Sequence, residues 1–145
     1  MARIRGAGHR MTAQREAVVR ALVNSERHPS AEELFTSVRA EHSGLSLATV
    51  YKTLDVLKAL GEVLELEFRD GAMPGNRYDG VRPHAHPHLV CVSCGTIEDL
   101  ETDPLAGQAQ AMAESRGYRV ERYRFDLYGL CPTCQARARA CGHTR

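Results

Sequence analysis

The chain has 145 residues, of which 43% are hydrophobic and 26% charged, and its formal net charge is +1. Such a composition is typical of a globular protein of one domain or two small ones, and no apolar run is long enough to cross a membrane. The first residues lack the apolar core of a secretion signal, so we expect a cytoplasmic protein with reduced thiols.

Charge is divided unevenly along the chain. Residues 1–61 contain nine Lys and Arg against six Asp and Glu, whereas the remainder contains ten against twelve. A basic first half is compatible with nucleic-acid binding and equally with an ordinary solvated surface, so charge alone does not decide between them.

The first sixty residues predict three helices. Thr12 is a capping residue, and apolar residues follow it at helical spacing: Val18, Val19, Leu22 and Val23. Ser30 and Glu33 have the spacing of a capping box at the start of the second helix. The third helix is expected from Ser46 to Leu60, with Gly61 as its stop.

A hairpin is predicted after the helices. Residues 62–68 alternate Leu or Phe with Glu, which indicates a half-buried strand, and residues 77–79 return after a turn-rich stretch. Three helices and a hairpin make a winged helix-turn-helix, whose third helix enters the major groove of DNA. Thr49, Tyr51 and Lys52 are then candidate base or phosphate contacts. The alternative is an ordinary amphipathic surface helix.

Histidines at alternate positions, His84, His86 and His88, precede the cysteines Cys91 and Cys94. In a strand running to Cys91, the histidines share one face and the first thiolate lies on the other. One metal cannot easily collect both sets, so we infer two metal sites. The alternative for the histidines is a titratable surface strand.

A second CxxC pair, Cys131 and Cys134, follows a long strand predicted from Tyr118 to Tyr128. A strand at residues 96–101 and a helix at residues 103–116 are expected between the two pairs. Two CxxC pairs at this separation are a strong signal for a closed tetrahedral zinc site. We interpret the remaining candidates, Cys141 and His143, as non-ligands.

Two stretches of the sequence resemble the ferric uptake regulator (Fur) superfamily. Ser46-Leu47-Ala48-Thr49-Val50-Tyr51 is similar to its recognition-helix signature, and residues 84–95 with residues 128–134 are similar to its dimerisation domain. The resemblance covers about residues 8–135 and implies an α+β fold. A winged helix-turn-helix DNA-binding domain is expected at residues 1–80, and a small α/β dimerisation and metal-binding domain with a four-cysteine zinc site at residues 81–145.

The resemblance implies a homodimeric, metal-dependent transcriptional repressor that binds double-stranded DNA at an AT-rich inverted repeat. Carried over by motif, the structural Zn²⁺ is held by Cys91, Cys94, Cys131 and Cys134. A regulatory Fe²⁺ or Mn²⁺ is held by His28, Asp79, His86, His88 and Asp99. His84 is a spare ligand. The expected DNA contacts are Arg10, Arg15, Ser46, Ala48, Thr49, Tyr51 and Lys52.

The aspartate pair with three histidines resembles the peroxide-sensing (PerR) branch, which implies oxidation of His28 or His86. One alternative is an iron- or manganese-uptake regulator without peroxide chemistry. A metallo-hydrolase or a thiol redox protein is a further alternative, but the sequence offers no positioned general base beyond the ligands themselves. We therefore expect a regulator and not an enzyme.

Overall fold

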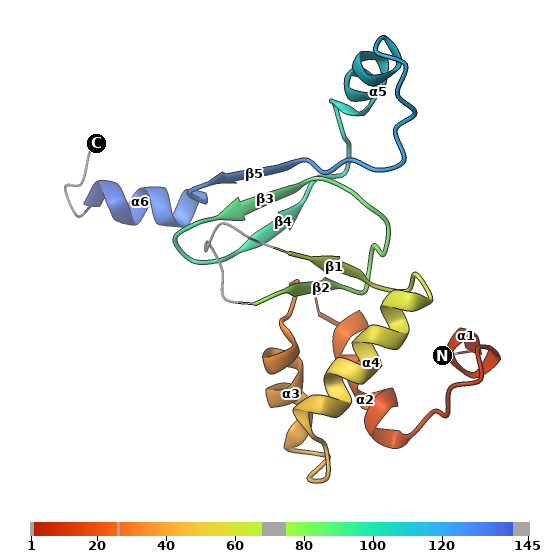
Figure 1. The fold of residues 1–145 in the computed structure, drawn as a ribbon. Coiled ribbons are helices and arrows are strands. Elements are labelled where there is room, and N and C mark those ends of the chain that lie inside the picture. Colours follow the sequence, from red (N-terminus) through yellow and green to blue (C-terminus); the bar gives the residue numbers. More distant parts are fainter. Residues whose placement is uncertain (1, 26, 68–74, 141–145) are drawn as a thin grey trace. The chain divides into compact units, whose positions relative to one another are not determined.

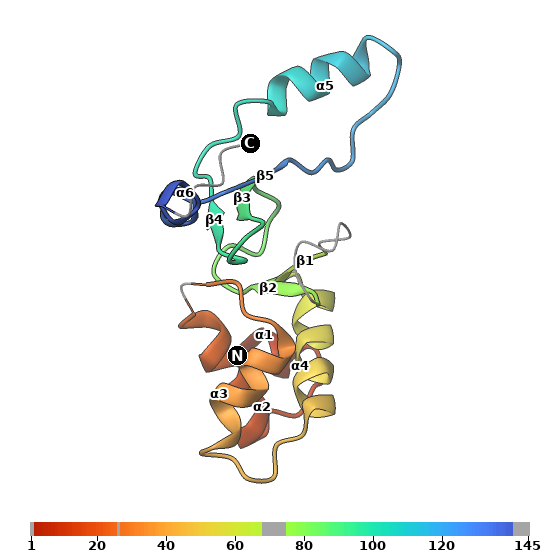
Figure 2. The same ribbon diagram turned by 90° about the vertical axis from the view of Figure 1, so that its left-hand side faces the viewer.

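The computed structural model describes residues 2–25, 27–67 and 75–140. The chain divides into two compact units, Met1–His84 and Ala85–Arg145, and each is described by itself. Figure 1 traces the elements of both units in chain order, and Figure 2 gives a second view. None of the helices in the described ranges combines the length and the apolar character needed to span a bilayer.

The first unit contains four helices and a two-stranded antiparallel hairpin: α1 (Ala2–Gly6), α2 (Ala13–Val23), α3 (Ala31–Arg39), α4 (Leu47–Ala59), β1 (Leu64–Leu66) and β2 (Arg77–Asp79). The predicted N-caps Thr12 and Ser30 are confirmed, because each side chain accepts a backbone N–H of its helix. Ser46, predicted as the first residue of the third helix, is the N-cap of α4. Ser30 and Glu33 complete the capping box. The predicted winged helix-turn-helix is thus present.

The hydrophobic core of the first unit lies between its helices and the hairpin. Its members come from every element except β1, and also from the segments before α4 and β1: Ile4, Val18, Val19, Leu22, Ala31, Leu34, Val38, Leu45, Val50, Leu54, Leu57, Val63 and Tyr78. Val23, expected on the buried face, is 47% exposed. It follows Leu22 by one position, and one residue of a helix turns the side chain by about 100° away from the core.

The wing is held against the start of α3. β1 and β2 pair with Leu64 opposite Asp79, and the amide of Tyr78 donates to the carbonyl oxygen of Pro29 at 3.0 Å. The first strand is shorter than the predicted 62–68, and Phe68 lies outside the described residues. Gly80 follows the wing directly, where a Cβ atom would lie 2.6 Å from Cγ of the buried Leu22.

The second unit is a three-stranded sheet with two helices: β3 (His88–Cys91), β4 (Ile97–Asp99), α5 (Ala106–Glu114), β5 (Asp126–Gly129) and α6 (Pro132–Ala140). The strand order is β4-β3-β5, with β3 antiparallel to β4 and parallel to β5. The short β4 and α5 lie within the predicted ranges 96–101 and 103–116. The expected small α/β unit is confirmed in outline.

The histidine strand is shorter than predicted. β3 begins at His88, so His84 and His86 precede it in the chain segment before the strand, and the inference that all three histidines share a strand face is wrong. Pro83 and Pro87 explain the late start, because proline has no N–H to donate to a sheet ladder. Two separate ligand groups nevertheless form, as described below.

The predicted strand from Tyr118 to Tyr128 is also wrong in extent. Regular pairing begins only at Asp126, because its partner β3 has four residues and its register runs from His88 opposite Asp126 to Cys91 opposite Gly129. The C-terminal helix α6 was not predicted. Its signals were present in the sequence, since Pro132 suits the first helical position and the Ala- and Arg-rich residues after it favour helix.

The close approach at Gly80 gives a stability prediction. Gly80→Ala should lower the free energy of unfolding by about 1–3 kcal/mol, because the added methyl overpacks against Leu22. Urea denaturation followed by circular dichroism measures the change. The matched control is Gly107→Ala in α5, where a Cβ atom meets nothing within 4 Å. An equal denaturation midpoint for Gly80→Ala and the wild type would contradict the packing described here.

Candidate metal centres and DNA-binding surface

Four cysteine side chains converge in the second unit, where β3 ends and α6 begins. The Sγ atoms of Cys91, Cys94, Cys131 and Cys134 all lie within 4.8 Å of one another. Sγ of Cys94 and Sγ of Cys131 are 3.8 Å apart. Two ligands on a tetrahedron with Zn–S bonds of about 2.3 Å are separated by about 3.8 Å. The donor set and its spacing therefore fit a structural zinc ion.

The local backbone makes the cluster and prepares its thiols. Gly95 at φ 73° closes the turn that returns the chain from Cys91 to β4. The amide of Cys131 donates to Sγ of Cys91 at 3.3 Å, which lowers the pKa of the Cys91 thiol to about 6. The Thr96 hydroxyl lies 3.2 Å from Sγ of Cys94, and this contact lowers the pKa of the Cys94 thiol. Both effects favour the thiolate, which is the form that binds metal.

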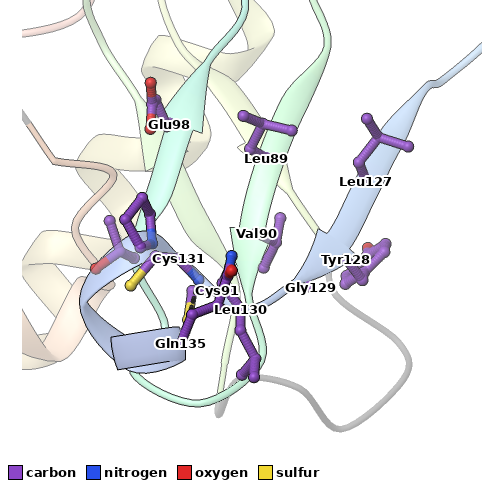
Figure 3. Close-up of a pocket in the computed structure, with 12 residues that line it drawn as sticks. Leu89, Val90, Cys91, Glu98, Leu127, Tyr128, Gly129, Leu130, Cys131 and Gln135 are labelled. Atoms are coloured by element: carbon purple, nitrogen blue, oxygen red, sulfur yellow. Dashed lines mark hydrogen bonds between the residues drawn. The ribbon is translucent and has the colours of Figure 1, made fainter. Parts of the chain in front are cut away.

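A hollow of about 310 Å³ lies beside this cluster, along β3 and β5 (Figure 3). Leu89 and Leu127 are paired in register across the two strands and line the hollow with Leu130. These three side chains are 36%, 46% and 42% exposed. The single chain therefore leaves an apolar surface open on its second unit.

Imidazoles and a carboxylate form another group in the same unit. Nε2 of His86 lies 3.2 Å from Oδ1 of Asp99, and Nε2 of His88 lies 3.8 Å from the same oxygen. The register of β3 and β4 places His88 directly opposite Asp99. His88 is buried and the two others are half-buried. Three ligand atoms at these spacings surround a position that suits a divalent ion with nitrogen and oxygen ligands.

Asp126 lies on the other side of the His88 ring and was missed from the sequence. Its Oδ1 is 3.0 Å from Nδ1 of His88, and its Oδ2 is bound by Arg124. Burial raises the pKa of the Asp126 carboxyl, but the hydrogen bonds with His88 and Arg124 outweigh burial and hold that pKa below its usual range. An aspartate within an apolar strand was the available signal, because aspartate is rarely buried without a partner.

The first unit brings together the other two predicted regulatory ligands. Nε2 of His28 lies 3.9 Å from Oδ2 of Asp79, and both side chains are buried. The backbone amides of Val81 and Arg82 donate to Oδ1 of Asp79 at 2.8 and 2.9 Å. These two bonds orient the carboxylate and direct its other oxygen to His28.

The sequence contains three further candidate ligands: His84, Cys141 and His143. His84 is exposed, and it belongs to neither group of metal-ligand candidates found in the described part of the chain. Cys141 and His143, interpreted as non-ligands, lie outside the described residues.

The predicted DNA contacts lie at the N-terminal ends of α2 and α4. Ala48, Tyr51 and Lys52 are exposed on α4, and the hydroxyl of Thr49 lies 2.9 Å from that of its N-cap Ser46. In α2, the side chain of Arg15 donates to the carbonyl oxygen of Arg10 at 2.6 Å, a contact that constrains the arginine. The predicted DNA contacts therefore include exposed side chains and side chains that already form local hydrogen bonds.

Tyr51 has a partner that sequence reasoning missed. Its hydroxyl donates to Oε1 of Glu32 in α3 at 2.7 Å, and this hydrogen bond raises the pKa of the tyrosine. The bond fixes the ring at the exposed start of α4. Nothing in the local sequence pattern signals a contact across 19 residues.

The cysteine cluster gives a prediction about zinc. Cys91→Ser and Cys134→Ser should each abolish the bound zinc and unfold the second unit, because the ion contributes about 10–16 kcal/mol in small zinc peptides. Elemental analysis and circular dichroism measure the two losses. The matched control is Cys141→Ser, which should keep one zinc per chain. If only Cys141→Ser lost its zinc, the assignment of the zinc ion to Cys91, Cys94, Cys131 and Cys134 would be wrong.

Comparisons with known proteins identify the family of the chain. The ferric uptake regulator family matches residues 6–128. The chain is 34% identical over 135 residues to the peroxide-responsive repressor PerR of Staphylococcus aureus, covering 93% of this chain and 88% of that protein.

Solved structures show the same fold. The ferric uptake regulator of Helicobacter pylori, described with three functional metal binding sites, matches with a TM-score of 0.78 and 25% identity over 92% of this chain and 87% of that one. A zinc-bound manganese uptake regulator matches with a TM-score of 0.68 and 31% identity over 88% of this chain and 94% of the other. The chain belongs to the ferric uptake regulator family.

Proposed function

We propose that this protein is a metal-dependent transcriptional repressor, in which one Fe²⁺ or Mn²⁺ is bound jointly by the two units. The observation that carries the proposal is the divided ligand set. His28 and Asp79 form a buried pair in the first unit, and His86, His88 and Asp99 form a group in the second. Neither group alone fills an octahedral site of about six ligands, because the first offers two side chains and the second three.

The chain between the two groups is short. Asp79 and His86 are seven positions apart, so they can be separated by about 25 Å at most. A closed arrangement of the units is within reach of this segment. An ion that binds ligands from both units stabilises only that arrangement. It shifts the equilibrium between the open and closed forms by the difference between its affinities for the two.

DNA binding falls to the winged helix-turn-helix. Its α4 begins with small, hydroxyl and basic side chains at exposed positions, which suits insertion into the major groove. The operator is an AT-rich inverted repeat, and a homodimer places one winged helix on each half-site. The open apolar surface around Leu89, Leu127 and Leu130 supports this dimer, because a second copy would remove it from water. The protein acts in the cytoplasm.

The similarity to PerR supports peroxide as the signal. Fe²⁺ held by these residues would supply the electron that reduces hydrogen peroxide to hydroxide and a hydroxyl radical. The resemblance to the PerR branch points to His28 and His86 as the oxidation-sensitive side chains, and each has a ring nitrogen beside a proposed ligand carboxylate. Loss of either imidazole removes a ligand from one of the two groups and so weakens the link between the units.

An iron- or manganese-uptake regulator without peroxide chemistry is the second candidate. The same ligand set supports it, since aspartate and histidine also suit a simple corepressor site. The two candidates differ in one outcome, the fate of DNA binding after peroxide.

The metal dependence is tested by gel shift on the protein's own upstream DNA. Mn²⁺ should promote DNA binding by the wild type. Asp99→Ala should need a Mn²⁺ concentration at least about tenfold higher, because the substitution removes a direct ligand. Glu101→Gln is the matched control: this exposed acid lies two positions after Asp99, outside β4, and belongs to neither group of candidate ligands. Binding that is indifferent to Mn²⁺ in all three proteins would refute the proposal.

The peroxide response is tested by mass spectrometry. After mild peroxide, the Fe²⁺-loaded protein should release DNA and gain one oxygen atom in the peptide holding His28 or His86. The Mn²⁺-loaded protein should do neither. DNA release with both histidine peptides unmodified would exclude the oxidation mechanism, and retention of DNA by the iron form would favour the uptake regulator.

A further inference from the structure

The side chain of Asp126 has a position that the ligand set does not explain. It lies directly opposite His88 in the parallel register of β3 and β5, with Oδ1 at 3.0 Å from Nδ1 of the ring. The two side chains are 5% and 2% exposed. A buried carboxylate at this distance from a ring nitrogen accepts its hydrogen bond and restricts the rotation of the ring.

The two ring nitrogens of His88 have different neighbours. Nδ1 points to Asp126, whereas Nε2 points to Asp99 at 3.8 Å. A carboxylate accepts and does not donate, so Asp126 selects the tautomer with the proton on Nδ1. The lone pair is then on Nε2, the nitrogen that lies beside the ligand Asp99. Asp126 cannot bind the same ion, because it lies across the ring from that position.

Arg124 holds Asp126 in place. Its Nε donates to Oδ2, so the arginine takes one carboxylate oxygen and His88 takes the other. The arginine is two positions before the aspartate on the same segment, and it is 43% exposed while the carboxylate is buried. The cation offsets the cost of burying a negative charge beside His88.

The cysteine cluster fixes this pairing. Cys91 ends β3 three residues after His88, and Cys131 lies five residues after Asp126. The Cys131 amide donates to Sγ of Cys91, and the Val92 amide donates to the Gly129 carbonyl oxygen at 2.9 Å. The thiolates therefore tie the two strands together at one end. A slip of one residue would turn Asp126 to the opposite face of the sheet.

We propose that Asp126 is a positioning residue for the regulatory metal: it holds His88 with its proton on Nδ1 and its Nε2 lone pair directed to the ion, in a register set by the four-cysteine zinc site. This inference rests on the proposed function, since it needs His88 to be a metal ligand. It couples the two metal sites, because loss of zinc frees β5 and with it the partner of His88.

The test uses the full-length zinc-loaded protein and Asp126→Asn. Asparagine has nearly the same shape, but its amide donates to Nδ1 and so favours the tautomer with the proton on Nε2. Calorimetric titration with Mn²⁺ should show a dissociation constant raised about 10- to 100-fold. Nitrogen-15 spectra of the histidine rings without Mn²⁺ should show the proton of His88 on Nδ1 in the wild type and on Nε2 in the variant.

Controls separate positioning from damage to the fold. Zinc content and circular dichroism of Asp126→Asn should match the wild type, and Asp126→Glu should restore the wild-type tautomer. The exposed-acid control Glu101→Gln should leave the Mn²⁺ affinity and the His88 tautomer unchanged. A wild-type His88 with its proton on Nε2 would overturn the inference without any variant. So would an Asp126→Asn protein that binds Mn²⁺ as tightly as the wild type.

The failure of the proposed function looks different. If Mn²⁺ does not broaden the His88 signals of the wild type, then His88 is not a ligand and the regulatory site itself is wrong. If Mn²⁺ broadens them and the variant has unaltered affinity, only the role of Asp126 is refuted.

Discussion

The four cysteine thiolates are the contact on which the second unit depends. Within the described residues, the residues of this unit that are buried as a whole, prolines apart, are Val90, Cys91, Cys134 and His88, whereas the connected hydrophobic core lies wholly in the first unit. Helix α5 buries no residue, and each strand has only three or four. So little apolar burial cannot offset the entropy of ordering the chain. A metal ion that closes the 40-residue separation of Cys91 and Cys131 replaces the missing core.

The sheet register that the thiolates fix also places the histidine ligands. Opposite His88 stand Asp99 on one neighbouring strand and Asp126 on the other, so a single residue of β3 meets a carboxylate on each side. The first unit uses a different device. Its capping box begins α3 directly after His28 and Pro29, and the wing strand donates to the Pro29 carbonyl oxygen while Asp79 follows two residues after Arg77. Each unit therefore positions the proposed ligands that it contributes.

Local signals in the sequence predicted the parts that depend on local physics. The caps Thr12 and Ser30 and the CxxC pairs were readable because each acts within four residues of itself. The length of β5 was not readable, because it depends on the four residues of β3 that it meets. Pro83 and Pro87 marked the late start of β3, but the alternation of histidines concealed it. Asp126 and Glu32 were missed because their partners lie 38 and 19 positions away.

The proposed division of ligands between the two units has a consequence for regulation. The proposed ligand Asp79 ends the wing strand, and the residues beside it bind the start of α3 and the segment before it: Arg77 pairs with Glu33 at 2.6 Å, and the amide of Tyr78 donates to the carbonyl oxygen of Pro29. If a bound ion fixes the position of Asp79, it therefore also restrains the wing and α3, because these contacts connect them directly. To take such a protein from about 1% to about 99% closed, an ion must bind the closed form about 10⁴-fold more tightly. The proposed sharing of ligands between the units would supply that difference, because an open form would offer the ion the ligands of one unit only.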